Sequence, residues 1–260
     1  MNKVIWITGA SSGIGKALAE AYCKMGFRII ITARRENKLL ELKNNCSNPE
    51  NVVVLTHDLA NYNAAKEVAA KAIEAFGSID IMIHNAGISQ RSLAIDTDID
   101  VDKKLMEVNY LGTVALTKAL LPFFTKQQKG HFAVITSLVG KFGSPYRSGY
   151  AASKHALHGF FDSLRAEHTK DNLKVTLICP GYVITNVSIN ALTGNGTPQK
   201  TMDEATANGI TAEYAASKII KAIDNNKLEV YIGKKEILGV YLKRFFPNLF
   251  AKILAKAKVT

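Results

Sequence analysis

The chain has 260 residues, of which 47% are apolar, and this composition fits one domain with a large hydrophobic core and excludes a low-complexity chain. The 33 basic residues exceed the 22 acidic ones, and the net charge of +11 predicts a surface that favours anions. The start of the sequence lacks a signal peptide, and no apolar stretch reaches the roughly 18 residues that span a bilayer, so we expect a soluble cytoplasmic protein.

The cysteines and histidines do not show the spacing of a metal site. Cys23, Cys46 and Cys179 lie in unrelated segments, and we expect buried free thiols in a reducing compartment. The six histidines form no H-E-x-x-H motif and no Cys/His cluster. We therefore expect no metal site.

The first apolar run, residues 4–8, predicts a strand that passes through a glycine-rich turn into a helix ending at Gly26. Glycines in this context let the backbone approach a pyrophosphate, which the helix N-terminus then stabilises, whereas the alternative is a turn without a ligand. The residues expected at the phosphates are Gly9, Ser11, Ser12, Gly13, Ile14 and Gly15.

The second apolar run, residues 27–33, ends in Arg34 and Arg35. An acid at this position usually binds the 2′-hydroxyl of the adenosine ribose, whereas an arginine suits a 2′-phosphate. The sequence therefore favours NADP over NAD, and the alternative is a pair of solvated surface arginines.

The rest of the chain repeats the same alternation of buried strands and helices. Further strands are expected over residues 52–56, 79–84, 132–136, 174–179 and 228–232, and further helices over 36–45, 61–76, 148–170 and 211–224. A long helical segment carrying Asn109 runs to about Gln127, with a bend at Pro122. This order predicts an α/β fold with a doubly wound, seven-stranded parallel sheet in one domain over residues 1–260.

Tyr150 and Lys154 are four positions apart, which places their side chains on one face of the predicted helix. A positive charge beside a phenol lowers its pKa, so Tyr150 could exchange a proton with a carbonyl or alcohol oxygen. Ser137 follows a buried strand and would lie at the carboxyl edge of the sheet, where ligands bind in such folds. A chance Tyr/Lys pair on a helix is the alternative.

Two segments are expected to shape a substrate pocket. Residues 186–209 are rich in Asn, Thr and Gly and predict a mobile lid. Within residues 138–147, Val139 and Phe142, together with Pro145 and Tyr146, predict an apolar wall that suits a hydrophobic ketone or secondary alcohol.

The last segment, residues 234–260, is apolar and basic, with Leu249, Phe250, Ile253 and Leu254 at helical spacing and Lys252, Lys256 and Lys258 on other faces. Two interpretations remain open. The extension is either an amphipathic helix packed on its own domain or on another subunit, or an interfacial helix that lies on an acidic membrane.

Taken in order, these motifs resemble the short-chain dehydrogenase/reductase family over essentially the whole chain. The residues that carry the resemblance are Thr8 to Gly15, Asp58, Asn85-Ala86-Gly87, Asn109, Ser137, Tyr150 to Lys154 and Pro180 to Thr185. Ala33-Arg34 and residues 153–161 resemble the NADP-dependent, hydroxysteroid-dehydrogenase-like branch. Two positions depart from the pattern: His84 stands where Asn is more frequent, and Ser12 stands where some NADP-preferring relatives carry a basic residue.

The resemblance implies a role for each matching residue. Tyr150 would be the proton donor and acceptor, Lys154 would lower its pKa and bind the nicotinamide ribose, and Ser137 would orient the substrate oxygen. Asn109 would hold a water that links Lys154 to solvent. Cofactor contacts are further implied for Asp58 and Leu59 at the adenine, and for Asn85, Ala86, Gly87, Pro180, Gly181, Val183 and Thr185 at the ribose and nicotinamide.

The sequence thus predicts an NADP(H)-dependent oxidoreductase that interconverts a carbonyl and an alcohol. A non-catalytic dinucleotide sensor or adaptor on the same fold is the alternative. By resemblance we expect a homodimer or homotetramer packed through the long helices that carry Asn109 and Tyr150. We expect no nucleic acid partner.

Overall fold

Seven parallel strands form one sheet in the order β3-β2-β1-β4-β5-β6-β7. They are β1 (Val4–Thr8), β2 (Arg28–Ala33), β3 (Val52–Thr56), β4 (Ile81–His84), β5 (Gly130–Ile135), β6 (Leu173–Pro180) and β7 (Glu229–Ile232). This computed structural model describes residues 3–257. Residues 1–2 and 258–260 lie outside the described part, and with them Lys258 and the two ends of the predicted domain. The predicted α/β class, parallel sheet and number of strands are confirmed.

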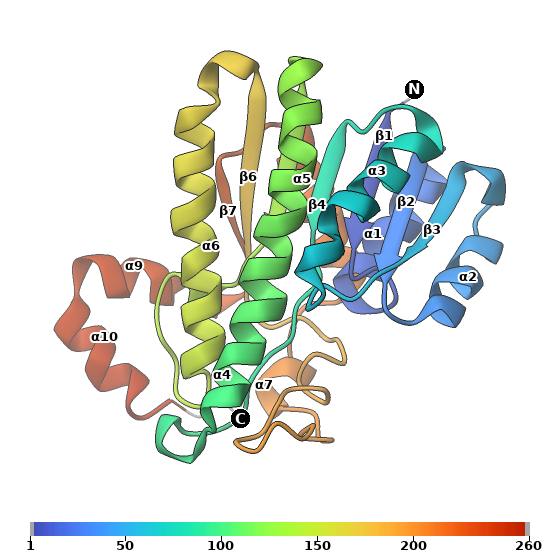
Figure 1. The fold of residues 1–260 in the computed structure, drawn as a ribbon. Coiled ribbons are helices and arrows are strands. Elements are labelled where there is room, and N and C mark those ends of the chain that lie inside the picture. The colour runs from blue at the N-terminus through green and yellow to red at the C-terminus, as the bar shows by residue number, and fades with distance from the viewer. Residues whose placement is uncertain (1–2, 258–260) are drawn as a thin grey trace.

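Helices cover both faces of the sheet (Figure 1). The α-helices are α1 (Gly13–Lys24), α2 (Glu36–Asn44), α3 (Ala65–Phe76), α4 (Ile99–Met106), α5 (Gly112–Lys126), α6 (Ser148–Glu167), α7 (Glu204–Ala207), α8 (Ala212–Asp224), α9 (Leu238–Phe245) and α10 (Pro247–Leu254). Between α4 and α5 the chain makes a π-helical turn over Glu107–Leu111. Pro122 lies inside α5, and α6 ends at Glu167, three residues before its predicted end.

The hydrophobic core has two layers because successive side chains of a strand point to opposite faces of the sheet. Ile5 and Ile7 of β1 belong to the layer that includes α1, α2 and α8. Val4 and Trp6 belong to the layer under α3, α5 and α6. All four side chains are fully buried, which explains why the strands read as continuous apolar runs rather than alternating ones.

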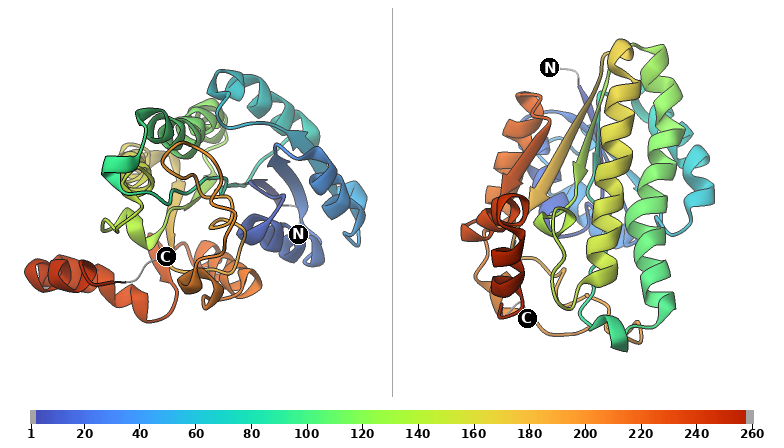
Figure 2. Two further views of the ribbon diagram at one scale, coloured as in Figure 1. Left: turned by 90° about the horizontal axis from the view of Figure 1, so that it is seen from below. Right: turned by 90° about the vertical axis from the view of Figure 1, so that its left-hand side faces the viewer.

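The strand order reverses between β1 and β4, so their connections leave in opposite directions and open a crevice at the carboxyl edge. In Figure 1 this edge lies at the lower end of the sheet, above the irregular segment that contains α7. The view from below in Figure 2 shows that segment crossing the strand ends. The fold therefore directs every βα loop named by the sequence motifs toward one edge.

Cys23 and Cys46 correct the prediction of free thiols. Cys23 lies near the end of α1 and Cys46 follows α2, and the structure joins them in a disulfide with their Cα atoms 5.9 Å apart. Cys179 is the free cysteine and is buried, as predicted.

Two histidines lie inside the sheet as neutral side chains. His84 donates from Nε2 to Thr117, 2.9 Å away, because the Thr117 hydroxyl itself donates to the Thr113 carbonyl. Burial lowers the pKa of His84 to about 3. His131 lies 2.8 Å from the Thr176 hydroxyl, and burial, followed by the charge of Lys174, lowers its pKa to about 4.

These histidines predict a stability that depends on pH. Their folded pKa values lie below the unfolded value of about 6.5, so the unfolded chain binds protons first as the pH falls. Stability that is present above pH ~6.5 should decrease toward pH 4, by on the order of 1 kcal/mol per pH unit for each histidine. Urea unfolding at pH 7 and pH 5 measures this loss, and His131→Gln should remove about half of it. Equal free energies of unfolding at the two pH values would contradict the account.

Candidate active site

The glycine turn after β1 is held in place by Asn85, the first residue after β4. Its side-chain amide donates to the carbonyls of Thr8, at 3.0 Å, and Gly9, at 3.3 Å. The Thr8 hydroxyl accepts from the backbone N–H groups of Asn85 and Ala86 at 3.1 and 3.2 Å. These contacts join the loops on both sides of the strand reversal.

The glycines of this turn are required by the backbone. Gly9 and Gly13 have φ angles of +69° and +56°, a region that disfavours a side chain. A Cβ atom on Gly15 would lie 2.4 Å from both the Gly9 carbonyl and the Asn85 amide. The turn thus brings backbone N–H groups at the start of α1 to a position that a diphosphate can reach, and the residues fit a dinucleotide.

Arg35 folds back over the glycine turn. Its Nη2 atom donates to the hydroxyls of Ser11 and Ser12 at 3.0 and 3.1 Å. A guanidinium group therefore lies on the loop even though the loop itself contains no basic residue. Arg34 is exposed beside it.

The predicted adenine residues differ in environment. Asp58 is exposed at the end of β3 and accepts from the N–H of Ala60 at 3.1 Å. The side chain of Leu59 is buried in the core. The backbone carbonyl of Leu59 lies so close to Gly112 of α5 that a Cβ atom at Gly112 would not fit. Leu59 therefore fixes the loop that presents Asp58.

The predicted catalytic residues meet at the carboxyl edge. Ser137 follows β5, and its hydroxyl is 3.3 Å from the Pro180 carbonyl and accepts from the Val139 N–H. Its side chain also lies close enough to the Tyr150 phenol to favour a lower pKa of Tyr150. Lys154, one turn further along α6, is buried, donates to the Ile135 carbonyl at 2.9 Å and lies 5.8 Å from the centre of the Tyr150 ring.

Burial shifts the pKa of both residues of this pair. It raises the pKa of Tyr150, and the nearby Ser137 side chain and the charges of Arg91 and Arg147 oppose this without reversing it. Burial also lowers the pKa of Lys154 to about 8. The raised pKa leaves Tyr150 a neutral phenol at neutral pH, able to donate its proton, and the lowering of that pKa by Lys154 stays a prediction.

Asn109 lies in the π turn that joins α4 to α5, and turns of this kind are frequent at functional sites. Its side chain is fully buried, accepts from the Ile88 N–H at 2.8 Å and donates to the Ile88 carbonyl and to Ser153. A Cβ on Gly87 would lie 3.0 Å from Asn109 Oδ1 and 3.4 Å from Lys154 Nζ. Asn109 thus fixes the loop after β4 against α6, and its link to water stays a prediction.

The segment after β6 closes the crevice from the other side. A Cβ on Gly13 would lie 3.0 Å from the Thr185 methyl group, so Thr185 lies directly against the glycine turn. Glu236 accepts from the Tyr182 N–H at 3.2 Å and fills the space beside Gly181. Val183 is buried and pairs with Ile210, next to α8. Of these contacts the sequence did not indicate that of Glu236.

Gln90 positions the start of α6. Its side-chain oxygen accepts from the N–H groups of Gly149 and Tyr150 at 2.9 and 3.2 Å, and so satisfies donors that the first turn of a helix leaves unpaired. Its amide donates to Ser148 and to Thr97. This capping residue comes from the β4 side of the crevice and could not be recognised from the helix sequence.

A buried group of three charged side chains holds the predicted lid, residues 186–209, against the site. Asp203, just before α7, accepts from Arg91 at 2.9 and 2.5 Å, and Arg147 lies 3.6 Å from the same oxygen. Burial acts to raise the pKa of Asp203, but the hydrogen bonds from Arg91 and Gln199 and the two positive charges lower it overall. The segment predicted as mobile therefore has one rigid anchor, which sequence reasoning missed.

Loss of this anchor should destabilise the fold. Asp203→Asn removes the carboxylate shared by two buried guanidinium groups, and breaking a buried ion pair costs about 3 kcal/mol. Urea unfolding should show this loss, and limited proteolysis should cut faster within residues 186–209. Glu204→Gln, at the neighbouring exposed carboxylate, is the matched control and should change stability by less than about 0.5 kcal/mol. Equal stability of the two variants would exclude the anchor.

The predicted apolar wall is only partly where the sequence put it. Phe142 is buried and packs on Phe250 of α10, with ring centres 5.1 Å apart, and half-buried Val139 joins the same cluster. Phe142 therefore supports the C-terminal helices, and contact of Val139 with a substrate stays a prediction. Tyr146 remains exposed and has a positive φ of 62°.

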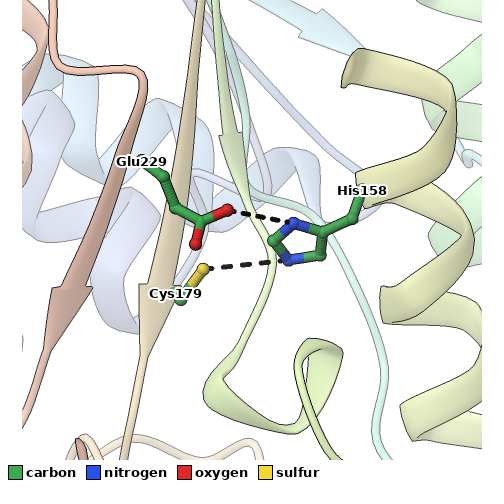
Figure 3. A group of neighbouring side chains, drawn as sticks. All are labelled: His158, Cys179 and Glu229. Atoms are coloured by element: carbon green, nitrogen blue, oxygen red, sulfur yellow. Dashed lines mark hydrogen bonds and ion pairs between the residues drawn. The ribbon is translucent and has the colours of Figure 1, made fainter. Parts of the chain in front are cut away.

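A second polar cluster lies behind the site (Figure 3). His158 of α6 faces Glu229 of β7 with Nδ1, at 3.5 Å, and Cys179 of β6 with Nε2, at 3.8 Å. Within residues 3–257 this is the group of His, Cys, Asp and Glu side chains with donor atoms close enough for a metal ion. However, the Cys179 thiol and the Glu229 carboxylate lie at opposite nitrogens of the His158 ring. Burial raises the pKa of Cys179 to about 12, which disfavours the thiolate that binds metals. Lys141 forms an ion pair with Glu229 at 3.0 Å. The cluster fits a polar contact between strands and helix better than a metal site.

Comparisons with known proteins agree with this architecture. Residues 3–195 match the family described as short chain dehydrogenase. Dehydrogenase/reductase SDR family member 7B from Bos taurus is 42% identical over 98% of this chain and 81% of its own length. A Dehydrogenase/reductase SDR family protein 7-like from Anopheles gambiae is 42% identical over 98% of this chain and 82% of its own.

Solved structures share the fold. A short-chain dehydrogenase from Streptomyces avermitilis superposes with a TM-score of 0.83 at 27% identity, covering 97% of this chain and 96% of that one. A short chain dehydrogenase/reductase from Burkholderia phymatum in complex with NAD has a TM-score of 0.85 at 22% identity and covers 95% of each chain. The fold and the edge site define a dinucleotide-binding oxidoreductase of the α/β class. The chain belongs to the short-chain dehydrogenase family.

Proposed function

We propose that this protein is an NADP(H)-dependent reductase that converts a hydrophobic ketone or aldehyde to an alcohol, with Tyr150 as the general acid. The observation that carries the proposal is the position of Tyr150, one helical turn from buried Lys154 and near Ser137, at the edge that also carries the glycine turn. A neutral phenol can give a proton to a carbonyl oxygen as that oxygen gains negative charge.

Each residue acts on a specific atom in this mechanism. Ser137 and Tyr150 hold the carbonyl oxygen, Tyr150 donates its proton to it, and Lys154, fixed by Ile135, supports the tyrosine and the nicotinamide ribose. Bound NADPH would supply the hydride to the carbonyl carbon. The glycine turn, Asp58, the segment Asn85 to Gly87 and the segment Pro180 to Thr185 would hold that cofactor at the crevice.

Removal of the phenolic hydroxyl tests the chemistry. Tyr150→Phe should bind NADPH as well as the native chain but lower kcat for ketone reduction by about a hundredfold or more, because only the transferable proton is lost. Turnover is followed by NADPH absorbance with a panel of hydrophobic ketones and aldehydes. Tyr214→Phe, at an exposed tyrosine of α8, is the matched control and should retain full activity.

If the protein is instead a dinucleotide sensor without catalysis, the same experiment should give the opposite result. A sensor requires NADPH binding with no turnover of any carbonyl in the panel, and no difference between the native chain and Tyr150→Phe. The grouping of Ser137, Tyr150 and buried Lys154 favours the enzyme, because a sensor needs no such polar group at the nicotinamide end of the crevice.

Arg35 supports the choice of NADP. Together with the hydroxyls of Ser11 and Ser12 it forms a cationic group with hydrogen-bond donors where the adenosine 2′-phosphate would lie. The archaeal alcohol dehydrogenase from Thermococcus sibiricus, solved with 5-hydroxy-NADP, has the same fold, with a TM-score of 0.76 at 24% identity over 90% of this chain and 97% of that one. That likeness shows only the fold, so the preference depends on the arginines.

Arg35→Ala should therefore weaken NADP binding roughly tenfold or more and leave NAD binding nearly unchanged, because a charge-assisted bond to a phosphate contributes about 1.5–3 kcal/mol. Titrations with both cofactors measure the ratio of dissociation constants. Lys38→Ala removes a nearby exposed cation, paired with Glu41, and should leave the ratio as it is. A native chain that binds both cofactors equally would contradict the preference.

Assembly into a homodimer or homotetramer through α5 and α6 stays a prediction, as does a cytoplasmic location. Half-buried Tyr110 and Phe160, whose rings meet at 6.3 Å between these helices, leave apolar surface that a second subunit could cover.

A further inference from the structure

The two C-terminal helices, α9 and α10, extend beyond the sheet as an arm (Figure 2). Their inner face packs on the domain through Val240 and Phe250, which contact Leu138, Phe142 and Cys179. Burial of these side chains fixes the arm in place. The extension therefore packs on its own domain through one face, as the first interpretation predicts. That packing does not account for its other face.

Both helices also carry large apolar side chains that are about half or more exposed, although the ring of one of them, Tyr241, meets that of Tyr231 in β7 at 6.1 Å. On each helix they recur at positions i, i+3 and i+7, the spacing of a single helical face. They are Leu238, Tyr241 and Phe245 on α9, and Phe246, Leu249 and Ile253 on or beside α10, with exposed fractions between 48% and 68%. Soluble surfaces seldom leave such a set uncovered.

Only positive charges accompany this face. Residues 238–257 contain Lys243, Arg244, Lys252 and Lys256, all exposed, and no Asp or Glu. The helical spacing puts Arg244, Lys252 and Lys256 at the border of the apolar stripe. An apolar stripe bordered by cations, with aromatic rings among its members, has the composition of helices that lie in a membrane interface.

We propose that α9 and α10 form a docking surface for an anionic lipid membrane, with the apolar side chains in the headgroup layer and the cations on acidic lipids. A second copy of this chain is the poorer occupant, because two such faces would bring like charges together. The attachment is peripheral, and within residues 3–257 no helix is long and apolar enough to cross a membrane.

The position of the arm gives the docking a consequence for the site. Phe250 and Val240 pack on Leu138 and Phe142, and Leu138 directly follows Ser137. The membrane would thus lie beside the loop that forms one wall of the crevice. A lipophilic substrate could then pass from the bilayer to the site over a short path. The docking itself does not depend on the reaction.

Sedimentation with vesicles tests the proposal with the full chain. The protein should sediment with phosphatidylcholine vesicles that contain phosphatidylserine, more weakly with phosphatidylcholine alone, and less as salt rises. The variant Phe245→Ser/Phe246→Ser/Leu249→Ser should lose about tenfold or more in vesicle partitioning. Met25→Ser/Leu40→Ser, which replaces exposed apolar residues after α1 and on α2, should bind vesicles as the native chain does.

A second pair of variants isolates the charge. Arg244→Glu/Lys252→Glu/Lys256→Glu should abolish the dependence on phosphatidylserine. Lys24→Glu/Lys66→Glu/Lys118→Glu, with the same change in net charge at exposed sites elsewhere, should keep most of it.

The replaced side chains are exposed, so unfolding temperature and NADPH binding should stay native in these variants. Failure of the native chain to bind phosphatidylserine vesicles at low salt would overturn the proposal. So would equal binding by the arm variants and their controls, or an arm variant that turns a dimer into a monomer while the native chain ignores vesicles.

Discussion

The contact between Thr8 and Asn85 is the constraint on which the site depends. It joins the glycine turn after β1 to the loop after β4, the two segments that the strand reversal would otherwise let separate. Asn109 then holds that loop against α6 through Ile88 and Ser153. In consequence, the cofactor turn and the helix that carries Tyr150 have a fixed relative position, and proton and hydride transfer both require such precision.

Burial decides the protonation of the reacting groups more than neighbouring charge does. It keeps Tyr150 neutral and brings the pKa of Lys154 down to about 8, while two guanidinium groups nearby are partly balanced by Asp203. The same carboxylate anchors the lid segment. The site therefore combines a tyrosine kept protonated by burial with a covering segment held by the charges that surround that tyrosine.

The sequence predicted what local pattern determines. Buried apolar runs placed the strands correctly. The glycine turn and the predicted catalytic residues lie at one edge of the sheet because parallel strands all end there. Contacts between distant residues were not predictable. Arg91 and Asp203 are 112 positions apart and Cys23 and Cys46 are 23 apart, and neither pair has a local signal. Phe142 was assigned to a substrate wall because nothing in its own segment reveals that Phe250 packs on it.

The central claim is that Tyr150 acts as a neutral acid beside a protonated Lys154. The pH dependence of single-turnover NADPH oxidation with a hydrophobic ketone tests this claim most directly. The rate should be level below pH about 8 and fall above it, as Lys154 loses its proton. A reduction rate that rises with pH through this range would require a phenolate at Tyr150 and would contradict the account.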